Sequence, residues 1–320
     1  MAFAFTLDKK TILVVKALIA IVVLALLIRR VSWPDMYSAM QSADLIWISL
    51  ALALLPLNFY TQFHRWQLMV RHLHPNVKTG AILRSLLSGI TLGFITPGRF
   101  GEMGRAVFIP QSNWLALIGL TLVEKWYALL VVYLFGLLGL IPFLQSLLRP
   151  VVWVPALGTG LILVLCGIAL VLHPSFLAYV LKRFDHARRR KRLHQVLYGI
   201  SQLTPRLSLS LLVLTIVQVV TYLSQFYLIV KAFTALPLLS GFAAISSIMW
   251  SKTLLPISLG DLGIRETASV YFLGKIGVAD AIALDSALLL FTINVLVPAV
   301  IGFVALLQNR MALNGNGSTE

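Results

Sequence analysis

Long apolar runs separated by short polar segments dominate the chain. Six runs are close to the roughly 20 apolar residues that a helix needs to cross the hydrocarbon core of a bilayer. They cover residues 11–30, 44–64, 115–141, 151–173, 207–232 and 284–307. Two further apolar stretches, residues 81–110 and 241–280, are interrupted in their middles by proline and glycine. The pattern predicts an all-α polytopic membrane helix bundle with about six full spans and two broken segments.

Composition agrees with a single membrane domain over residues 1–320. The chain is 59% hydrophobic and 12% charged, whereas a soluble domain carries about 25% charged residues. Its net charge of +15 gathers at the ends of the apolar runs, most densely at residues 181–195. Because Phe184 is the only Phe, Tyr or Trp in this basic block, it lacks the aromatic interleaving of a nucleic-acid surface, and nucleic acid is not expected as a partner. We interpret residues 174–206 as a basic cytoplasmic loop beside anionic lipid headgroups.

Lys and Arg in short loops indicate the orientation. A cytoplasmic N-terminus places most of them on the cytoplasmic side, including one loop that holds Arg65, Arg71, Lys78 and Arg84. We therefore expect a multi-pass protein of the prokaryotic plasma (inner) membrane with both termini in the cytoplasm. Each broken stretch then starts and finishes on one side, as a re-entrant helical hairpin does. Residues 241–280 could instead form two short crossings, and charge does not separate the two possibilities.

The broken stretches share a motif of the form Pro-x3-Gly-acid-x-Gly, followed closely by arginine. The first copy contains Pro97, Gly101, Glu102, Gly104 and Arg105, and the second contains Pro256, Gly260, Asp261, Gly263 and Arg265. We propose repeat 1 at about residues 9–145 and repeat 2 at about 150–310, followed by a disordered tail at 311–320. An odd number of crossings in each copy makes this an inverted repeat, an arrangement known from transporters. Chance recurrence of a short Gly and Pro pattern is the alternative.

The chemistry of the motifs favours an anion. A non-helical turn at membrane depth persists only where protein or a water-filled cavity lines it, so the turns should face an interior cavity. A helix that restarts after such a turn carries partial positive charge at its N-terminus. Together with Arg99, Arg105 and Arg265, two cationic centres would face inward from opposite membrane faces. Such centres suit lipid phosphate.

The acidic residues of the motifs, Glu102, Asp261 and Glu266, have two possible roles. They could neutralise the neighbouring arginines as structural ion pairs, or they could contact a cationic group or carry a proton. Glu124 and Lys125 lie deep in the third span and should face the bundle, either as a helix-locking pair or as part of the pathway. The candidate substrate-binding residues are Arg99, Gly101, Glu102, Arg105, Glu124, Lys125, Gly260, Asp261, Gly263, Arg265 and Glu266. No catalytic residue and no metal site is predicted. Single polar residues in the spans are expected to form interhelical hydrogen bonds; they are Asn58, Gln218, Gln225 and Asn294.

The segments "TPGRFGEMGRAVFIP" and "LLPISLGDLGIRETASVYFLG" resemble the two signature stretches of the lysylphosphatidylglycerol synthase transmembrane-region family. The resemblance extends to Glu124-Lys125 and to "PAVIG" at residues 298–302. It implies a flippase-like membrane domain, which in multidomain relatives precedes a soluble aminoacyl-transferase domain. We expect this chain to lack that domain and not to aminoacylate lipids. The sequence departs from relatives at Asp261, where glycine is common, and at residues 291–294, "FTIN", where arginine is expected.

The favoured function is a flippase-like transporter, not an enzyme, with no cofactor. It would move a phosphate-bearing lipid, either a phospholipid or a polyprenyl-phosphate-linked lipid, between bilayer leaflets. Its partners would be membrane lipids, anionic phospholipid or lipid phosphate. The alternatives are an enzyme that modifies lipid headgroups and a non-transporting scaffold that recruits a lipid-synthesis enzyme through the basic loop.

Overall fold

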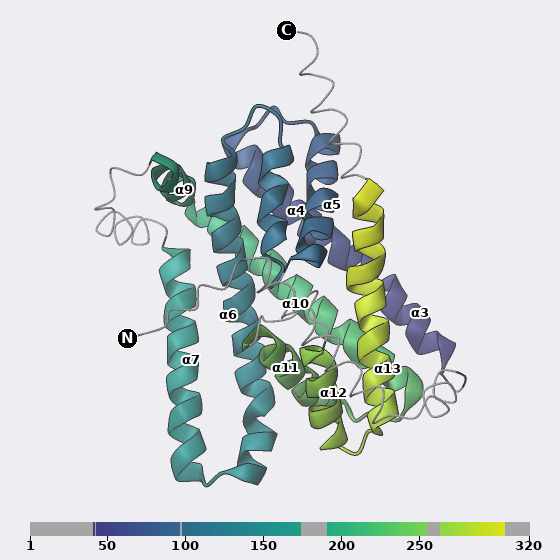
Figure 1. The fold of residues 1–320 in the computed structure, drawn as a ribbon. Helices are drawn as coiled ribbons and strands as arrows, with labels where there is room; N and C mark the ends of the chain where they lie inside the picture. Colours follow the sequence, from purple (N-terminus) through teal and green to yellow (C-terminus); the bar gives the residue numbers. More distant parts are fainter. Residues whose placement is uncertain (1–40, 42, 97, 174–190, 255–262, 305–320) are drawn as a thin grey trace, which may run out of the picture.

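A computed structural model describes residue 41 and residues 43–96, 98–173, 191–254 and 263–304. Within these residues every regular element is helical, so the predicted all-α bundle is confirmed (Figure 1). The elements are α3 (Leu45–Ala53), α4 (Leu55–Leu73), α5 (Thr79–Ile95), the 3₁₀ helix η1 (Phe100–Phe108), α6 (Trp114–Leu147), α7 (Pro150–Leu172), α9 (Lys191–Ser201), α10 (Pro205–Phe233), α11 (Leu238–Leu254), α12 (Ile264–Gly274), α13 (Asp280–Phe291) and the π-helical turn η2 (Thr292–Leu296).

Five helical segments of the described chain are long and apolar enough to cross a membrane. They are Leu45–Leu73, Trp114–Leu147, Pro150–Leu170, Pro205–Phe233 and Asp280–Val304. These match five of the six predicted runs. The remaining run, residues 11–30, and the tail at 311–320 lie outside the described residues. The protein is therefore a multi-pass membrane protein.

The first of these segments differs from its prediction in length and continuity. Helix α3 starts at an N-cap in which the Asp44 carboxylate accepts from the backbone N–H of Ile46 at 2.9 Å, and it ends at Ala53, with Leu54 as its C-cap. Pro56 stands in the first turn of α4, where its missing N–H is tolerated. Helix α4 then continues to Leu73. The prediction of Arg65 in a cytoplasmic loop is wrong, because Arg65 is buried inside this helix.

The predicted loop at residues 174–206 is also partly helical. Helix α9 packs directly on α6. A β-carbon on Gly199 would lie 2.0 Å from the backbone oxygen of Ala116, so only glycine allows this close approach. Residues 174–190, which hold most of the basic block, lie outside the described residues.

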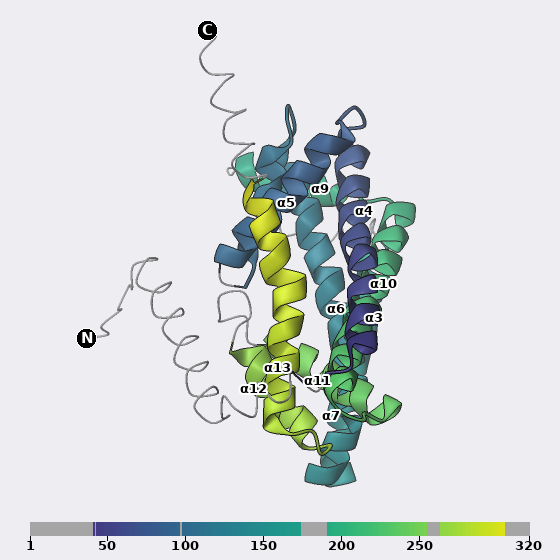
Figure 2. The same cartoon turned by 90° about the vertical axis from the view of Figure 1, so that its right-hand side faces the viewer.

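Both broken stretches form pairs of short helices. Helix α5 packs against η1, and α11 packs against α12. Two views of the molecule place α5 at one end of the bundle and the α11–α12 pair at the other (Figures 1 and 2). The break between α11 and α12, residues 255–262, is not described, and it includes Gly260 and Asp261.

The long helices α6 and α10 join two apolar cores. One core gathers buried side chains of α10, α11, α12 and α13 around Phe226 and Ile245. The other gathers those of α4, α5, α6 and α10 around Trp66 and Tyr127. Polar side chains from α4, α6, α10, η1 and the residue before η1 meet inside an otherwise apolar body.

Candidate functional site

A polar cavity of about 170 Å³ lies within the bundle, and we call it the chamber. Its charged lining consists of Arg65, Arg99, Glu102, Arg105, Glu124 and Lys125. Its uncharged polar lining consists of Asn58, Gln62, Gln218, Tyr222 and Asn294. Four cationic side chains face two carboxylates, so the lining carries a formal excess of two positive charges. At about 30 Å³ per molecule, the chamber has room for roughly five or six waters.

Glu124 on α6 joins two arginines from different elements. One of its carboxylate oxygens pairs with Arg65 of α4 at 3.2 Å, and the other pairs with Arg105 of η1. All three side chains are only 6% exposed. A buried carboxylate between two guanidinium groups fixes η1 and α4 against α6, and this triad keeps one net positive charge.

Both arginines of this triad are held by further contacts. Arg65 donates to the Thr215 hydroxyl of α10 at 2.8 Å. The Arg105 guanidinium lies over the Trp66 ring, 4.2 Å from its centre, in a cation–π geometry. The Nε atoms of Arg65 and Arg105 have no hydrogen-bond acceptor among the described residues. Each arginine therefore retains donor capacity.

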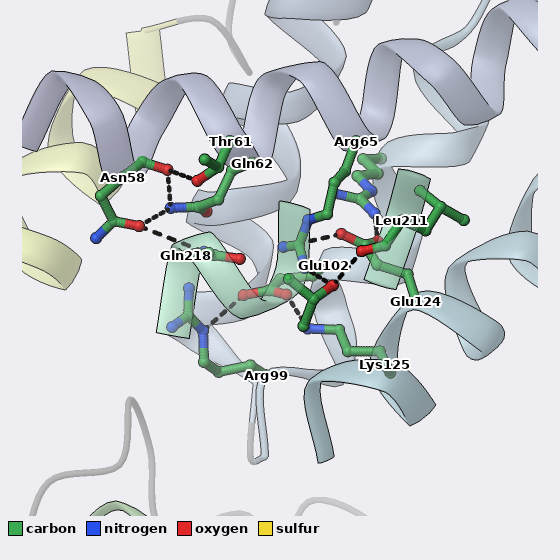
Figure 3. A network of polar contacts seen from close by, with 12 residues as sticks. Asn58, Thr61, Gln62, Arg65, Arg99, Glu102, Glu124, Lys125, Leu211 and Gln218 are labelled. Carbon is green, nitrogen blue, oxygen red and sulfur yellow. Dashed lines mark hydrogen bonds and ion pairs between the residues drawn. The ribbon is translucent and has the colours of Figure 1, made fainter. Parts of the chain in front are cut away.

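Glu102 forms a second triad, in which it lies between Arg99 and Lys125 (Figure 3). It pairs with Arg99 at 2.6 Å through one oxygen and with Lys125 through the other. The side chains of Arg99 and Lys125 are 25% and 36% exposed, so this triad is wetter than the first. It too keeps one net positive charge.

The motif places these side chains through an unusual turn. Gly98 and Arg99 both adopt left-handed backbone conformations, with φ of 60° and 57°. The Gly101 N–H donates to the Thr96 hydroxyl at 2.6 Å, and a β-carbon on Gly101 would lie 2.2 Å from the Leu92 backbone oxygen. Glycine at this position therefore lets η1 fold back onto α5 and direct Glu102 inward.

Neighbouring glycines of α5 make room for the same side chains. A β-carbon on Gly89 would meet Arg105 at 2.7 Å, and one on Gly93 would meet Glu102 at 2.5 Å. Gly104, in η1, faces the Leu92 side chain instead. The glycines of α5 thus leave space for the charged side chains of η1.

The polar residues of the spans form interhelical hydrogen bonds, as predicted, and join α4, α10 and η2. Asn58 of α4 hydrogen-bonds Gln225 and Gln218 of α10 and Asn294 of η2, at 3.3, 3.3 and 2.7 Å. Asn294 lies in a π-helical turn, a local distortion that is common at functional sites. Among the described residues, no three His, Cys, Asp or Glu side chains gather as a metal site would require.

Comparison with known proteins agrees with the motifs. The family model for the lysylphosphatidylglycerol synthase TM region matches residues 13–302. The chain belongs to this family. A search of curated proteins finds no match. Membership relates the protein to lipid handling in membranes.

The second family motif is arranged differently from the first. Arg265 and Glu266 of α12 are fully buried and pair with each other. Glu266 also accepts from the Gly263 N–H at 2.6 Å, and Gly263 begins the helix with φ of 93°. Arg265 does not line the chamber, but it lies in electrostatic range of Tyr222, which does. Arg265, the predicted second cationic centre, therefore lies outside the chamber lining and is already paired with Glu266.

Sequence reasoning missed three polar residues of the chamber: Gln62 and Arg65 of α4, and Tyr222 of α10. Asn58, Gln62 and Arg65 follow one another at spacings of four and three residues, which places them on one face of α4. A polar stripe on a span is the signal that would have found them. The predicted span ended at residue 64, directly before Arg65, and so this stripe was not recognised.

Proposed function

We propose that this protein moves a phosphate-bearing lipid headgroup between the leaflets of the plasma (inner) membrane. The chamber is the observation that carries the proposal. Its lining holds an excess of cationic groups inside a membrane bundle, where unneutralised charge is costly. A phosphodiester would neutralise one of the two excess charges and a phosphate monoester both, and guanidinium groups match the geometry of phosphate.

The size of the chamber fits a headgroup rather than a whole lipid. About 170 Å³ accommodates a small polar group and little else. Phe100 and Val107 of η1, which flank the charged motif, are exposed apolar side chains. Acyl chains would therefore remain in the bilayer while the headgroup occupies the chamber.

The placement of the two motifs supports alternating access. The helix pairs that carry them lie at opposite ends of the bundle (Figures 1 and 2). In our proposal they are re-entrant hairpins of an inverted repeat, and both termini are cytoplasmic. Rocking of one repeat against the other would open the chamber to each leaflet in turn.

A leaflet-resolved assay tests the proposal. The protein is reconstituted into vesicles with a fluorescent phospholipid, and an impermeant quencher reports how much lipid has reached the outer leaflet. We expect Arg99→Gln with Lys125→Gln to slow translocation by at least about tenfold, because charge-assisted hydrogen bonds contribute about 1.5–3 kcal/mol each.

Arg84→Gln is the matched control. Arg84 is an exposed cation of α5, in the same helix pair, but it does not line the chamber. It should leave translocation unchanged. Wild-type rates in the double variant would overturn the proposal. Analysis of the lipids recovered from these vesicles would reveal headgroup modification if the protein were an enzyme.

A further inference from the structure

Two histidines at the end of α4 make hydrogen bonds of opposite kinds. The Nε2 of His72, in the last turn, lies 2.7 Å from the backbone oxygen of Gln202. A carbonyl oxygen can only accept, so this Nε2 must carry a hydrogen. The Nε2 of His74, the C-cap residue, instead accepts the backbone N–H of Asn113 at 3.2 Å. This nitrogen must carry no hydrogen, and the His74 ring is therefore neutral.

Protonation affects these two bonds differently. A protonated imidazole carries a hydrogen on both ring nitrogens. His72 keeps its bond in that form, because its Nε2 already donates. His74 loses its bond, since its Nε2 would direct a hydrogen and a positive charge at the Asn113 N–H. Of the two bonds, that of His74 is the one that depends on pH.

The His74 bond closes the base of the first helix pair, α5 with η1. His74 lies between α4 and α5, and Asn113 lies between η1 and α6, as the N-cap of α6. The chain thus enters α5 and leaves η1 at two points that this bond joins. Among the described residues, no other hydrogen bond connects segment 74–78 to segment 109–113.

The segment that holds Asn113 is also strained. Gln111 adopts a left-handed backbone conformation with φ of 50°, which residues with a side chain rarely adopt. Such conformations persist only where surrounding contacts hold them. We therefore expect segment 109–113 to relax when the bond from Asn113 to His74 is lost.

The surroundings of His74 favour the neutral ring. Burial lowers the pKa of His74 from its ordinary value of 6.5. His74 forms no ion pair within the described residues. The titratable groups nearest along each surrounding element are Arg71 and His72 of α4, Lys78 before α5, Arg105 of η1, Glu124 of α6, Tyr198 of α9 and Arg206 of α10. Because the pKa is lower in the folded than in the unfolded protein, the bond stabilises the fold above pH 6.5 and is lost as the pH falls through the folded-state pKa.

We propose that His74 is a pH-sensitive clasp on the first helix pair. The neutral ring holds the two ends of the pair together through Asn113, and the protonated ring releases them. In our proposed topology both segments face the cytoplasm, so cytoplasmic pH is the signal. Release lets the pair move more freely against the rest of the bundle. The regulatory part of this proposal rests on the proposed function: acidification speeds lipid translocation.

Amide hydrogen exchange at Asn113 tests the clasp directly. The detergent-purified full chain is exchanged at about pH 7.5 and about pH 5, on either side of the ordinary histidine pKa. The protection factor removes the intrinsic pH dependence of exchange. We expect that of Asn113 to fall at least about fivefold at the lower pH, as the loss of one hydrogen bond predicts. The Leu148 N–H, at the other end of α6, is the internal control. An unchanged protection factor at Asn113 overturns the proposal.

Variants assign the response to His74. His74→Gln can still accept the Asn113 N–H through its side-chain oxygen but takes up no proton, so it should keep high protection at both pH values. His74→Phe retains a ring without an acceptor and should show low protection at both. His72→Gln is the matched control, because glutamine can still donate to the Gln202 oxygen. It should retain the wild-type pH response. A response that persists in His74→Gln, or that disappears in His72→Gln, overturns the proposal.

Translocation in vesicles at the same two pH values separates this proposal from the proposed function. Wild type should move lipid at least about twofold faster at the lower pH, whereas His74→Gln should show no such change. If Asn113 responds to pH but no lipid crosses in any variant, the proposed function fails and the clasp stands. If lipid crosses but the protection of Asn113 is constant, transport holds and the clasp is wrong. If Asn113 responds and the translocation rate does not, the regulatory part is wrong.

Discussion

The two copies of the motif place their arginines in opposite electrostatic settings. In the first copy, Arg105 pairs with Glu124 on another helix, and Glu124 also binds Arg65. In the second copy, Arg265 pairs with its neighbour Glu266 and is completely buried. One arginine belongs to a network that joins three elements around a polar chamber. The other belongs to a closed local pair.

The partner of the arginine, rather than the motif itself, accounts for this difference. Glu124 follows Arg105 by 19 residues. Asp285 follows Arg265 by 20 residues and is also buried in the long helix after the motif. Yet neither oxygen of Asp285 has a hydrogen-bond partner among the described residues. Since Glu266 already neutralises Arg265, no ion pair of the described residues joins Arg265 to Asp285 in the following span.

The largest effect is expected at the centre of the first network. Glu124→Gln would leave Arg65 and Arg105 as buried cations without a carboxylate. Loss of one partner of a buried ion pair costs about 3–5 kcal/mol, and we expect the upper end of this range because two cations lose their partner. The thermal unfolding midpoint in detergent should fall strongly.

Glu102→Gln is the comparison variant, since Glu102 joins the wetter triad with Arg99 and Lys125. It should cost about 1–2 kcal/mol, less than Glu124→Gln, because Arg99 and Lys125 are partly exposed and keep some solvation when the carboxylate is lost. If Glu124→Gln and Glu102→Gln lowered the free energy of unfolding equally, the distinction between a buried triad and a more exposed triad would be wrong.

Much of the fold, but less of the site, could be predicted from the sequence. Hydrophobic runs located five spans of the described chain, because burial in a bilayer requires continuous apolar surface. The same criterion failed at Arg65, since a charge that is neutralised within the bundle does not end a span. Apolar content reports what faces lipid, and it cannot reveal which cation has an internal partner.

The motifs indicated which charged residues of the first copy gather in the chamber, but not how those residues pair. The turn at Gly98 and Arg99 and the inward direction of Glu102 follow from local backbone rules. The pairing of Arg105 with Glu124, and of Arg265 with Glu266 rather than a distant acid, depends on how the helices pack. Glu266 directly follows Arg265, whereas Ala106 follows Arg105, but the sequence leaves open both pairing and a role in the cavity for the acids.

The second motif should respond differently to paired substitution. Glu266→Gln alone would leave Arg265 buried without a carboxylate and cost about 3 kcal/mol. Arg265→Met combined with Glu266→Gln removes both charges, while the glutamine oxygen can still accept from the Gly263 N–H. The double variant should unfold within about 1 kcal/mol of the wild type.

Arg105→Met combined with Glu124→Gln is the matched pair in the first motif. It should not be rescued in this way, because Arg65 would remain without its carboxylate. Rescue of both pairs in thermal unfolding would show that the first network is also a local pair.

A smaller effect is expected where the first helix pair folds back on itself. Gly101→Ala places a methyl group against the Leu92 backbone oxygen, which cannot move away as a side chain could. Such overpacking costs about 1–3 kcal/mol. Gly158→Ala on α7 meets nothing within 4 Å and should be neutral or slightly stabilising. Similar unfolding midpoints for the two variants would show that α5 and η1 are less closely packed than described.

The smallest effect is expected at Asp285, although it is a buried acid at nearly the same distance from its motif as Glu124. Asp285→Asn changes neither the shape of the side chain nor any hydrogen bond or ion pair within the described residues. The free energy of unfolding should therefore change by less than about 1 kcal/mol, as it does for most substitutions that remove no contact. Thermal unfolding of Asp285→Asn beside Glu124→Gln measures the contrast directly. A loss comparable to that of Glu124→Gln would mean that Asp285 has a cationic partner in the folded protein. In that case the second helix pair would be linked to the following span as the first one is.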